Sequence, residues 1–252
     1  MSFIVDPEAY DRFMGRYSRL LAPQLADFAA VSTGQRVLDV GCGPGALTAE
    51  LVERLGASAV SAVDPSEPFV SAAEVRHPGV DVRRAAAEQL PFQDGEFDAT
   101  LAQLVVHLMD NPTAGVDEMV RVTRGRGVVA ACVWDYAGGR GPVSVVWDAA
   151  HELDPNVADE SHLAGVREGH LGELFEAAGL QEVDEASHSI RVEHASFEEW
   201  WEPFTLGVGP AGRYVSGLDP ARQAELRERC REKLPPAPFV LEASAWAARG
   251  LA

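Results

Sequence analysis

A short apolar strand that runs straight into a glycine-rich turn constrains this chain more than any other feature. Residues 36–45 read Arg-Val-Leu-Asp-Val-Gly-Cys-Gly-Pro-Gly. Because Gly41, Gly43 and Gly45 lack a Cβ, the backbone can turn sharply at the strand end and lie against a ligand. A GxGxG pattern also occurs in ordinary tight turns, so the segments around it decide its meaning.

The segments after the glycine turn complete a βαβ unit. Residues 46–55 are amphipathic at helical spacing, and residues 60–64 form a second apolar strand that ends in Asp64. Asp64 follows Gly41 by 23 residues, close to the roughly 20 at which a carboxylate reaches the ribose hydroxyls of an adenosine cofactor. The alternative is that Asp64 caps a helix beginning at Pro65.

Strands and helices alternate along most of the chain. Residues 6–31 are predicted to be helical, with a break or a new first turn at Pro23, and residues 169–178 form a further helix. The alternation predicts an α/β fold with a doubly wound parallel sheet. The predicted strands are residues 36–40, 59–63, 80–84, 97–104, 127–133, 181–193 and 239–248.

Four ordered motifs resemble those of a known family. They are Val37-Leu-Asp-Val-Gly-Cys-Gly-Pro-Gly, Asp64-Pro-Ser, Ala87-Glu-Gln-Leu-Pro-Phe before Phe97-Asp, and Glu118-Met-Val-Arg-Val before a glycine-containing turn and a strand. At this spacing, over residues 10–135, the chain resembles the class I S-adenosylmethionine (SAM) dependent methyltransferases with a type 11 methyltransferase domain. The likeness is greatest to the small-molecule branch that includes enzymes of ubiquinone and menaquinone biosynthesis.

The resemblance implies a single Rossmann-like domain over residues 1–252, with a seven-stranded sheet that is mostly parallel and has an antiparallel last strand. An N-terminal helical segment, residues 1–31, precedes the sheet. Residues 136–168 and 195–238 are then cap or lid insertions over the active site. The second insertion holds aromatic side chains that either contact the substrate or form the small core of a helical excursion: Trp200, Trp201, Phe204 and Tyr214.

The resemblance also implies how the cofactor SAM is held before it leaves as S-adenosylhomocysteine (SAH). Asp39 approaches the ammonium group, Asp64 accepts hydrogen bonds from both ribose hydroxyls, and Pro65 and Ser66 flank the adenine. Gln103, after the fourth strand, offers a polar group to the ligand's amino group. The glycine loop presents backbone groups to the methionine and ribose through Gly41, Cys42, Gly43 and Gly45.

Two further expectations concern the ends of this cofactor. The N-terminal helix supplies Tyr10 and Arg16 for the carboxylate, unless Arg16 simply faces solvent. At the other end the family usually reads Asp-Ala-Glu before Leu-Pro-Phe, and the acid bonds the adenine amino group. Here Ala86 replaces that acid, so adenine recognition falls to the backbone of Ala87 and Glu88 or to the Glu88 side chain.

His107 is the candidate catalytic residue. Methyl transfer is an in-line displacement, so alignment supplies much of the rate, and a base is needed only if the acceptor must lose a proton. His107 follows the fourth strand and titrates near neutrality. The alternative is a histidine packed at the start of a helix.

The predicted function is SAM-dependent methyl transfer to a small-molecule acceptor. An NAD(P)-dependent dehydrogenase is an alternative, because Gly41, Gly43 and Ala46 also fit GxGxxG/A. Asp39 inside the strand and Pro44 in the loop speak against it. A SAM-binding regulatory protein without catalysis is the other alternative, which the missing acid at Ala86 favours.

Charge and composition narrow the partners. A net charge of −18 repels phosphate backbones and argues against a nucleic-acid substrate. No apolar stretch approaches the roughly 20 residues of a membrane span, and no signal peptide is recognised, so the protein is expected to be cytoplasmic. Three scattered cysteines without a CxxC pair, and histidines at no metal-ligand spacing, predict no metal site.

Overall fold

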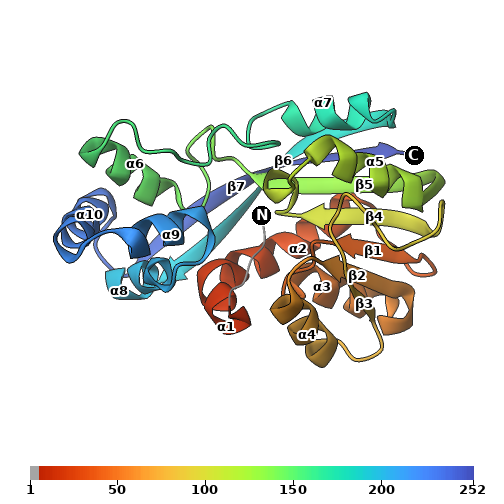
Figure 1. Cartoon of the computed structure of the whole chain (residues 1–252), viewed down its shortest axis with the longest axis horizontal. Helices are drawn as coiled ribbons and strands as arrows, with labels where there is room; N and C mark the ends of the chain where they lie inside the picture. Colours follow the sequence, from red (N-terminus) through yellow and green to blue (C-terminus); the bar gives the residue numbers. More distant parts are fainter. Residues whose placement is uncertain (1–5) are drawn as a thin grey trace.

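The computed structural model describes residues 6–252, which form one seven-stranded sheet with helices on both faces and a helical body at one end (Figure 1). The strands lie in the order β3-β2-β1-β4-β5-β7-β6. Pairings among β1 to β5 are parallel, whereas β7 is antiparallel to both β5 and β6. The predicted sheet, with its antiparallel last strand, is confirmed. The strands are β1 (Val37–Val40), β2 (Val60–Asp64), β3 (Asp81–Arg84), β4 (Phe97–Gln103), β5 (Thr123–Trp134), β6 (Gln181–His194) and β7 (Phe239–Leu251).

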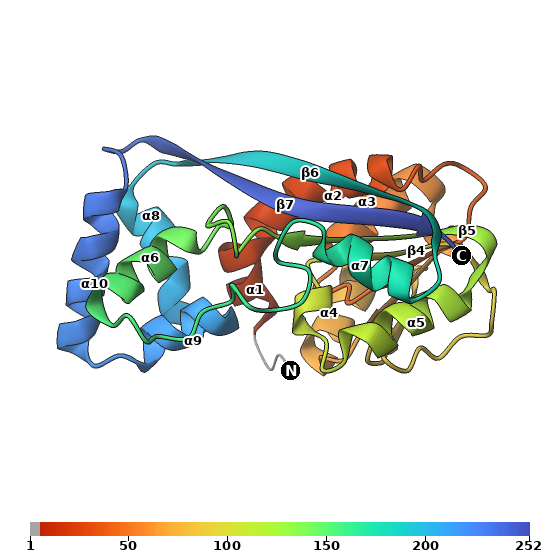
Figure 2. The same cartoon turned by 90° about the horizontal axis from the view of Figure 1, so that it is seen from above.

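Alternating side chains along the strands build a core on each face of the sheet. In β1, Val37 packs in the core that includes the buried sides of α2 (Arg16–Phe28) and α3 (Ala46–Leu55). Leu38 points the other way, into the core formed with α5 (Pro112–Val122) and α7 (His170–Ala177). Figure 2 shows these two helix pairs on opposite sides of the sheet. The central strands are therefore buried on both faces, as expected of a parallel sheet.

The N-terminal helix is interrupted, but not where the sequence predicts. Helix α1 (Pro7–Tyr10) passes through a π-helical turn (Asp11–Gly15) into α2. The prediction of a break at Pro23 is wrong, because Pro23 lies inside α2. A proline there removes one backbone hydrogen bond, yet the buried leucines on either side hold the helix against the sheet.

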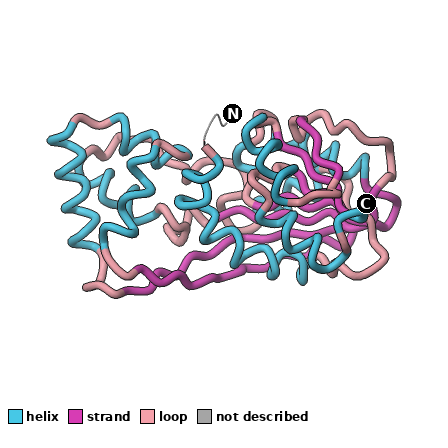
Figure 3. The backbone as a smooth tube through the Cα atoms, turned by 90° about the horizontal axis from the view of Figure 1, so that it is seen from below, coloured by secondary structure: helices cyan, strands magenta, loops and turns pink. Residues whose placement is uncertain are grey.

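The two predicted insertions, residues 136–168 and 195–238, pack on each other and form one helical body, here called the cap. It contains α6 (Ser144–Leu153), α8 (Phe197–Trp201), α9 (Gly209–Gly217) and α10 (Pro220–Lys233). Helix α6 packs against α10, and Lys233 Nζ lies 2.6 Å from Glu152 Oε1. Strands β6 and β7 extend from the sheet to the cap as a long two-stranded ribbon (Figure 3). A lid role for the cap stays a prediction.

The aromatic cluster of the second insertion forms an internal core. Trp200 and Phe204 are buried, and their ring centroids are 5.0 Å apart. Tyr214 packs against Trp147 of α6, with ring centroids 5.4 Å apart. The alternative that these rings form the small core of a helical excursion therefore fits the structure better than the alternative that they contact the substrate. None of the described helices is long and apolar enough to cross a bilayer.

Candidate active site

A cavity opens at the carboxyl ends of β1, β2, β3 and β4. Ligands of open α/β sheets bind at this edge, where the strand order reverses between β1 and β4. Most of the residues predicted to hold a cofactor line this cavity: Tyr10, Gly41, Gly43, Asp64, Pro65, Ala87, Glu88 and Gln103. Asp39, Cys42, Gly45, Ser66 and Arg16 do not.

The glycine turn shapes this cavity by its backbone rather than by offering hydrogen-bond donors. All three glycines have positive φ, which favours glycine. Gly41 N and Cys42 N donate to Val63 O of β2, and Gly45 N donates to Cys42 O. Gly43 N donates to Asp64 Oδ2 at 2.9 Å. These N–H groups are committed within the protein, so a ligand would meet the bare backbone surface of the turn.

The residues of the turn that do not line the cavity support it from behind. Cys42 packs with Ala62 and Ala73, and burial raises the pKa of its thiol well above the ordinary range. A Cβ on Gly45 would collide with the ring of His77. The predicted contacts of Cys42 and Gly45 with a ligand therefore find no geometric support.

Asp64 links the glycine turn to the next helix. Its Oδ2 accepts from Gly43 N, and its Oδ1 accepts from Ser66 N at 2.8 Å. Helix α4 (Glu67–Arg76) has Ser66 as its N-cap, so the alternative that Asp64 is the cap is wrong. Burial raises the pKa of Asp64 to about 6, although both hydrogen bonds favour the charged form. Each carboxylate oxygen keeps acceptor capacity for a ligand donor.

Two polar side chains near the cavity each have one unsatisfied oxygen. Asp39 Oδ2 accepts from Thr48 Oγ1 at 2.7 Å, while Asp39 Oδ1 has no hydrogen-bond partner within the described chain. Burial raises the pKa of Asp39 to about 7. Gln103 Nε2 donates to Ser18 O at 3.0 Å, and Gln103 Oε1 likewise lacks a partner among residues 6–252. Unsatisfied buried acceptors are costly unless a ligand completes them.

The far end of the cavity contains two carboxylates but no acid at position 86. Ala86, Ala87 and Glu88 all line it, and Glu88 Oε1 accepts from Asn111 N at 3.1 Å. Asp110, just before α5, lines the same end, and the sequence interpretation missed it. Its position in the loop after β4 could have predicted this, because the carboxyl end of β4 faces the site.

Arg16 lies away from this cavity, so its predicted contact with a ligand carboxylate has no support. Its guanidinium pairs with Glu199 at 2.7 Å and donates to Glu193 O at 3.0 Å. The alternative that Arg16 simply faces solvent does not fit these two contacts either. Tyr10 ends α1 and lines the cavity, whereas Arg16 begins α2 beyond the π-helical turn and lies outside it.

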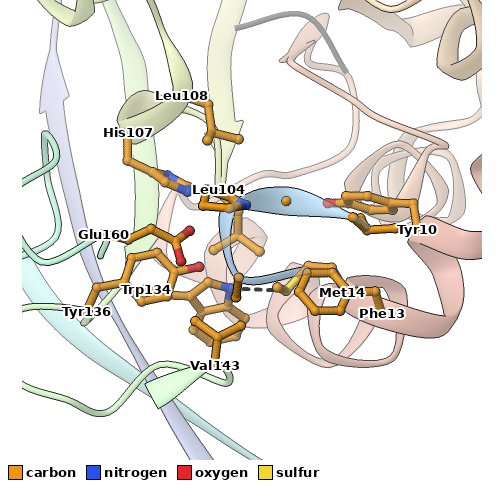
Figure 4. A pocket seen from close by; sticks show the side chains of 14 residues that line it. Tyr10, Phe13, Met14, Leu104, His107, Leu108, Trp134, Tyr136, Val143 and Glu160 are labelled. Carbon is orange, nitrogen blue, oxygen red and sulfur yellow. Dashed lines mark hydrogen bonds between the residues drawn. The ribbon is translucent and has the colours of Figure 1, made fainter. Parts of the chain in front are cut away.

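A second, smaller cavity adjoins the first, and Tyr10, Leu104 and Leu108 line both. Figure 4 shows its walls, which are largely aromatic and aliphatic. The start of α9, residues 208–211, closes it from the cap. His107, in a single 3-10 turn (Val106–Leu108), lines this smaller cavity and not the larger one.

His107 and Glu160 line the smaller cavity together with two tyrosines, Tyr10 and Tyr136. His107 is buried, and its Nδ1 finds no partner in the described structure. Burial lowers its pKa to about 3, which makes it a weak proton acceptor. Glu160, from the loop between α6 and α7, is only 4% exposed, and its Oε2 accepts from Trp147 Nε1 at 2.8 Å. The sequence carries no local signal for Glu160, since it lies in a loop of the cap.

Comparisons with known proteins agree with this architecture. Residues 38–131 match the family described as a methyltransferase domain. A malonyl-[acyl-carrier protein] O-methyltransferase of Erwinia billingiae is 32% identical over 122 residues, 48% of this chain and 47% of that protein. An uncharacterized methyltransferase of Mycobacterium bovis is 34% identical over 66% of this chain and 56% of its own length. The chain therefore spans about half the length of these relatives.

A solved structure extends the likeness to the whole fold. The phosphoethanolamine N-methyltransferase 2 of Haemonchus contortus, in complex with phosphomonomethylethanolamine and SAH, superimposes with a TM-score of 0.60. It is 16% identical, and the match covers 97% of this chain and 57% of that one. At this identity the likeness concerns the fold alone.

Proposed function

Because the chain belongs to the SAM-dependent methyltransferases by fold and family, we propose that it transfers the methyl group of SAM to a small-molecule acceptor. One observation carries the proposal. The larger cavity, with the glycine turn and Asp64, adjoins a smaller cavity through three shared residues. This arrangement suits a cofactor in the first and an acceptor in the second.

The residues of the larger cavity fit SAM. Asp64 has acceptor capacity for the ribose hydroxyls, and the bare backbone at Gly43 leaves room beside it, since a Cβ there would meet no atom within 4 Å. The unsatisfied oxygen of Gln103 suits an ammonium group. Glu88 and Asp110 lie at the end where adenine would rest. When bound, SAM supplies a methyl carbon activated by the sulfonium, and the protein aligns it.

The acceptor site favours a small molecule. Its largely aromatic and aliphatic walls suit a compact, largely apolar compound. The net charge of −18 disfavours a nucleic acid. Among the alternatives, a dehydrogenase is disfavoured by the family match and by β7, which is inserted antiparallel between β5 and β6. Asp110 offers a carboxylate near position 86, which weakens the case for a silent SAM-binding protein.

Calorimetric titration and thermal shift test the cofactor assignment. SAM and SAH are expected to bind and to raise the melting temperature, because a ligand of the folded state stabilises it by mass action. NAD and NADP are the controls and are expected to produce no shift. Binding of a dinucleotide without SAM or SAH would overturn the proposal.

A further inference from the structure

We propose that Glu160 is the catalytic base of the smaller cavity and that the acceptor carries an N–H or O–H group at the atom that is methylated. This inference rests on the function proposed above. It assigns chemistry to a side chain of the cap, about 120 residues from the glycine turn in the printed sequence. It also gives the cap a direct part in the reaction.

The placement of Glu160 is the first support. Glu160 lines the smaller cavity, and in Figure 4 its carboxylate lies on the side of His107 and Tyr136, across the cavity from Tyr10 and Met14. The indole N–H of Trp147 fixes one carboxylate oxygen. Tyr10 belongs to both cavities. A carboxylate held in this position faces the side from which a methyl group would arrive.

The pKa values of the two candidate bases, Glu160 and His107, also favour Glu160. Burial raises the pKa of Glu160 to about 7 and lowers the pKa of His107 to about 3. A general base works best when its pKa lies near the operating pH. Neighbouring Asp159 reinforces the rise at Glu160, whereas the Trp147 hydrogen bond and Arg213 of α9 oppose it. Burial, and after it the charge of Glu160, raise the pKa of Tyr136 well above its ordinary value, so Tyr136 stays protonated.

The chemistry of the cavity defines the acceptor class. Its walls include Phe13, Trp134 and Val143, so the body of the acceptor is apolar. A carboxylate in such surroundings selects a ligand with a hydrogen-bond donor, because an unpaired buried charge is costly. A phenol, an alcohol or an amine has this character, whereas a carbon acceptor without a donor does not.

The proposed step balances as follows. The lone pair of the acceptor heteroatom forms a bond to the methyl carbon. The carbon–sulfur bond breaks, and its electron pair stays on the sulfur, which becomes the neutral thioether. The proton of the heteroatom passes to the Glu160 carboxylate and is later lost to solvent.

The first experiment separates this inference from the proposed function. SAH titrations compare the wild type with Glu160→Gln, which keeps an oxygen for the Trp147 N–H. Because Glu160 does not line the larger cavity, the two affinities should agree within about twofold. If neither protein binds SAH, the proposed function fails. If only the variant loses SAH, Glu160 supports the cofactor site and the inference fails.

The second experiment measures binding of p-cresol, benzylamine and toluene to the SAH-saturated protein. Toluene lacks the donor of p-cresol, and benzylamine tests the amine. At pH 8 we expect p-cresol or benzylamine to bind at least about tenfold tighter than toluene, the scale of one hydrogen bond to a charged group. In Glu160→Gln this preference should fall below about threefold. Equal affinities in the wild type, or a preference unchanged in the variant, would overturn the inference.

The third experiment follows the reaction itself with methyl-labelled SAM and a panel of small phenols, alcohols and amines. For the best acceptor, the rate should rise with pH through about 7 as Glu160 ionises. Glu160→Gln should lose this inflection and at least about 100-fold in kcat, the usual contribution of a general base. Glu160→Asp, which retains a carboxylate, should keep the inflection with a smaller loss.

The control is Glu152→Gln, the same substitution on an exposed residue of α6 outside both cavities. It should match the wild type in affinity, rate and pH profile. The inference is wrong if Glu160→Gln retains the inflection. It is also wrong if SAH binds and no member of the panel is methylated.

Discussion

The two cavities are built from different kinds of segment. The larger one is formed mostly by the segments that follow β1, β2, β3 and β4, between residues 41 and 110. The smaller one draws on residues 10–14, 104–108, 134–143, 160 and 208–211, which lie far apart along the chain. The first cavity thus follows from the local geometry of strand ends, whereas the second exists only where the cap meets the sheet.

This contrast indicates that different parts of the molecule determine cofactor binding and acceptor specificity. A strand that ends in a glycine turn places its ligand by local backbone geometry, which a short motif can encode. The acceptor cavity depends on how α9 and the loop of Glu160 pack onto the sheet. Mutations in the two regions should therefore separate cofactor binding from acceptor chemistry, and the following predictions test that separation.

The largest effect is expected at the glycine turn. Gly41→Ala places a Cβ against the side chain of Val105 at a positive φ, whereas Gly43→Ala meets no neighbour within 4 Å. We expect Gly41→Ala to cost about 3 kcal/mol of folding stability and Gly43→Ala about 1 kcal/mol. Urea unfolding measures both. Equal losses would mean that the turn relaxes and that packing against Val105 does not fix it.

The next effect is on cofactor affinity. Asp64→Asn replaces the acceptor of two backbone N–H groups and should weaken SAH by about 1.5 to 3 kcal/mol, the range for hydrogen bonds to a charged group. Calorimetry of the folded variant provides the value. Asp81→Asn, on the exposed part of β3, is the matched control. Unchanged SAH affinity in Asp64→Asn would leave Asp64 with a purely structural role.

Glu160 of the cap should make the folding stability depend on pH. Burial raises the pKa of Glu160 from 4.5 to about 7, so between these values the unfolded chain ionises this residue while the folded chain keeps it protonated. The wild type should therefore lose about 1 to 3 kcal/mol relative to Glu160→Gln as the pH rises from 4.5 to 8. Urea unfolding at several pH values measures the difference.

Glu152→Gln is the control for this pH effect. Lys233 lowers the pKa of the exposed Glu152, so its contribution to stability is lost as the pH falls, with the opposite sign. Parallel stability curves for the wild type and Glu160→Gln across this pH range would show that Glu160 is not desolvated as the structure indicates.

A smaller gain is expected at position 86. Ala86 lines the larger cavity, so Ala86→Asp should tighten SAH by about 0.5 to 1.5 kcal/mol through a bond to the adenine amino group. Repulsion from Glu88 and Asp110 limits the gain. An SAH analogue with hydrogen in place of the 6-amino group is the control and should gain little. Equal tightening of both ligands would place adenine elsewhere.

The smallest effect is expected at Arg16. Arg16→Ala breaks the ion pair with Glu199 but should change SAH affinity by less than about 0.5 kcal/mol, because a half-exposed ion pair outside the cavity contributes little to it. Arg12→Ala, which breaks the exposed pair with Glu202, is the control. A large loss of SAH affinity only in Arg16→Ala would restore the carboxylate role predicted from the sequence.

The sequence alone determined the α/β class, the seven strands and the glycine turn, because these depend on periodicity and on backbone freedom over a few residues. It also located Asp64 and the absence of an acid at Ala86. The positions of these side chains follow from the ends of strands, and strand ends in a parallel sheet meet at one edge. Glu88 and Gln103 line the larger cavity because they lie at or after strand ends. Tyr10 lines it because it belongs to the N-terminal helix.

Only the tertiary structure decided the rest. In the folded chain, N–H groups of the turn donate hydrogen bonds to β2 and to Asp64. Arg16 forms an ion pair with Glu199, and Asp110 lines the cofactor cavity. The tertiary structure also joined two insertions into one cap and buried Glu160 beside His107. These outcomes depend on packing between segments distant in sequence and on desolvation of charge, neither of which a local pattern of residues can encode.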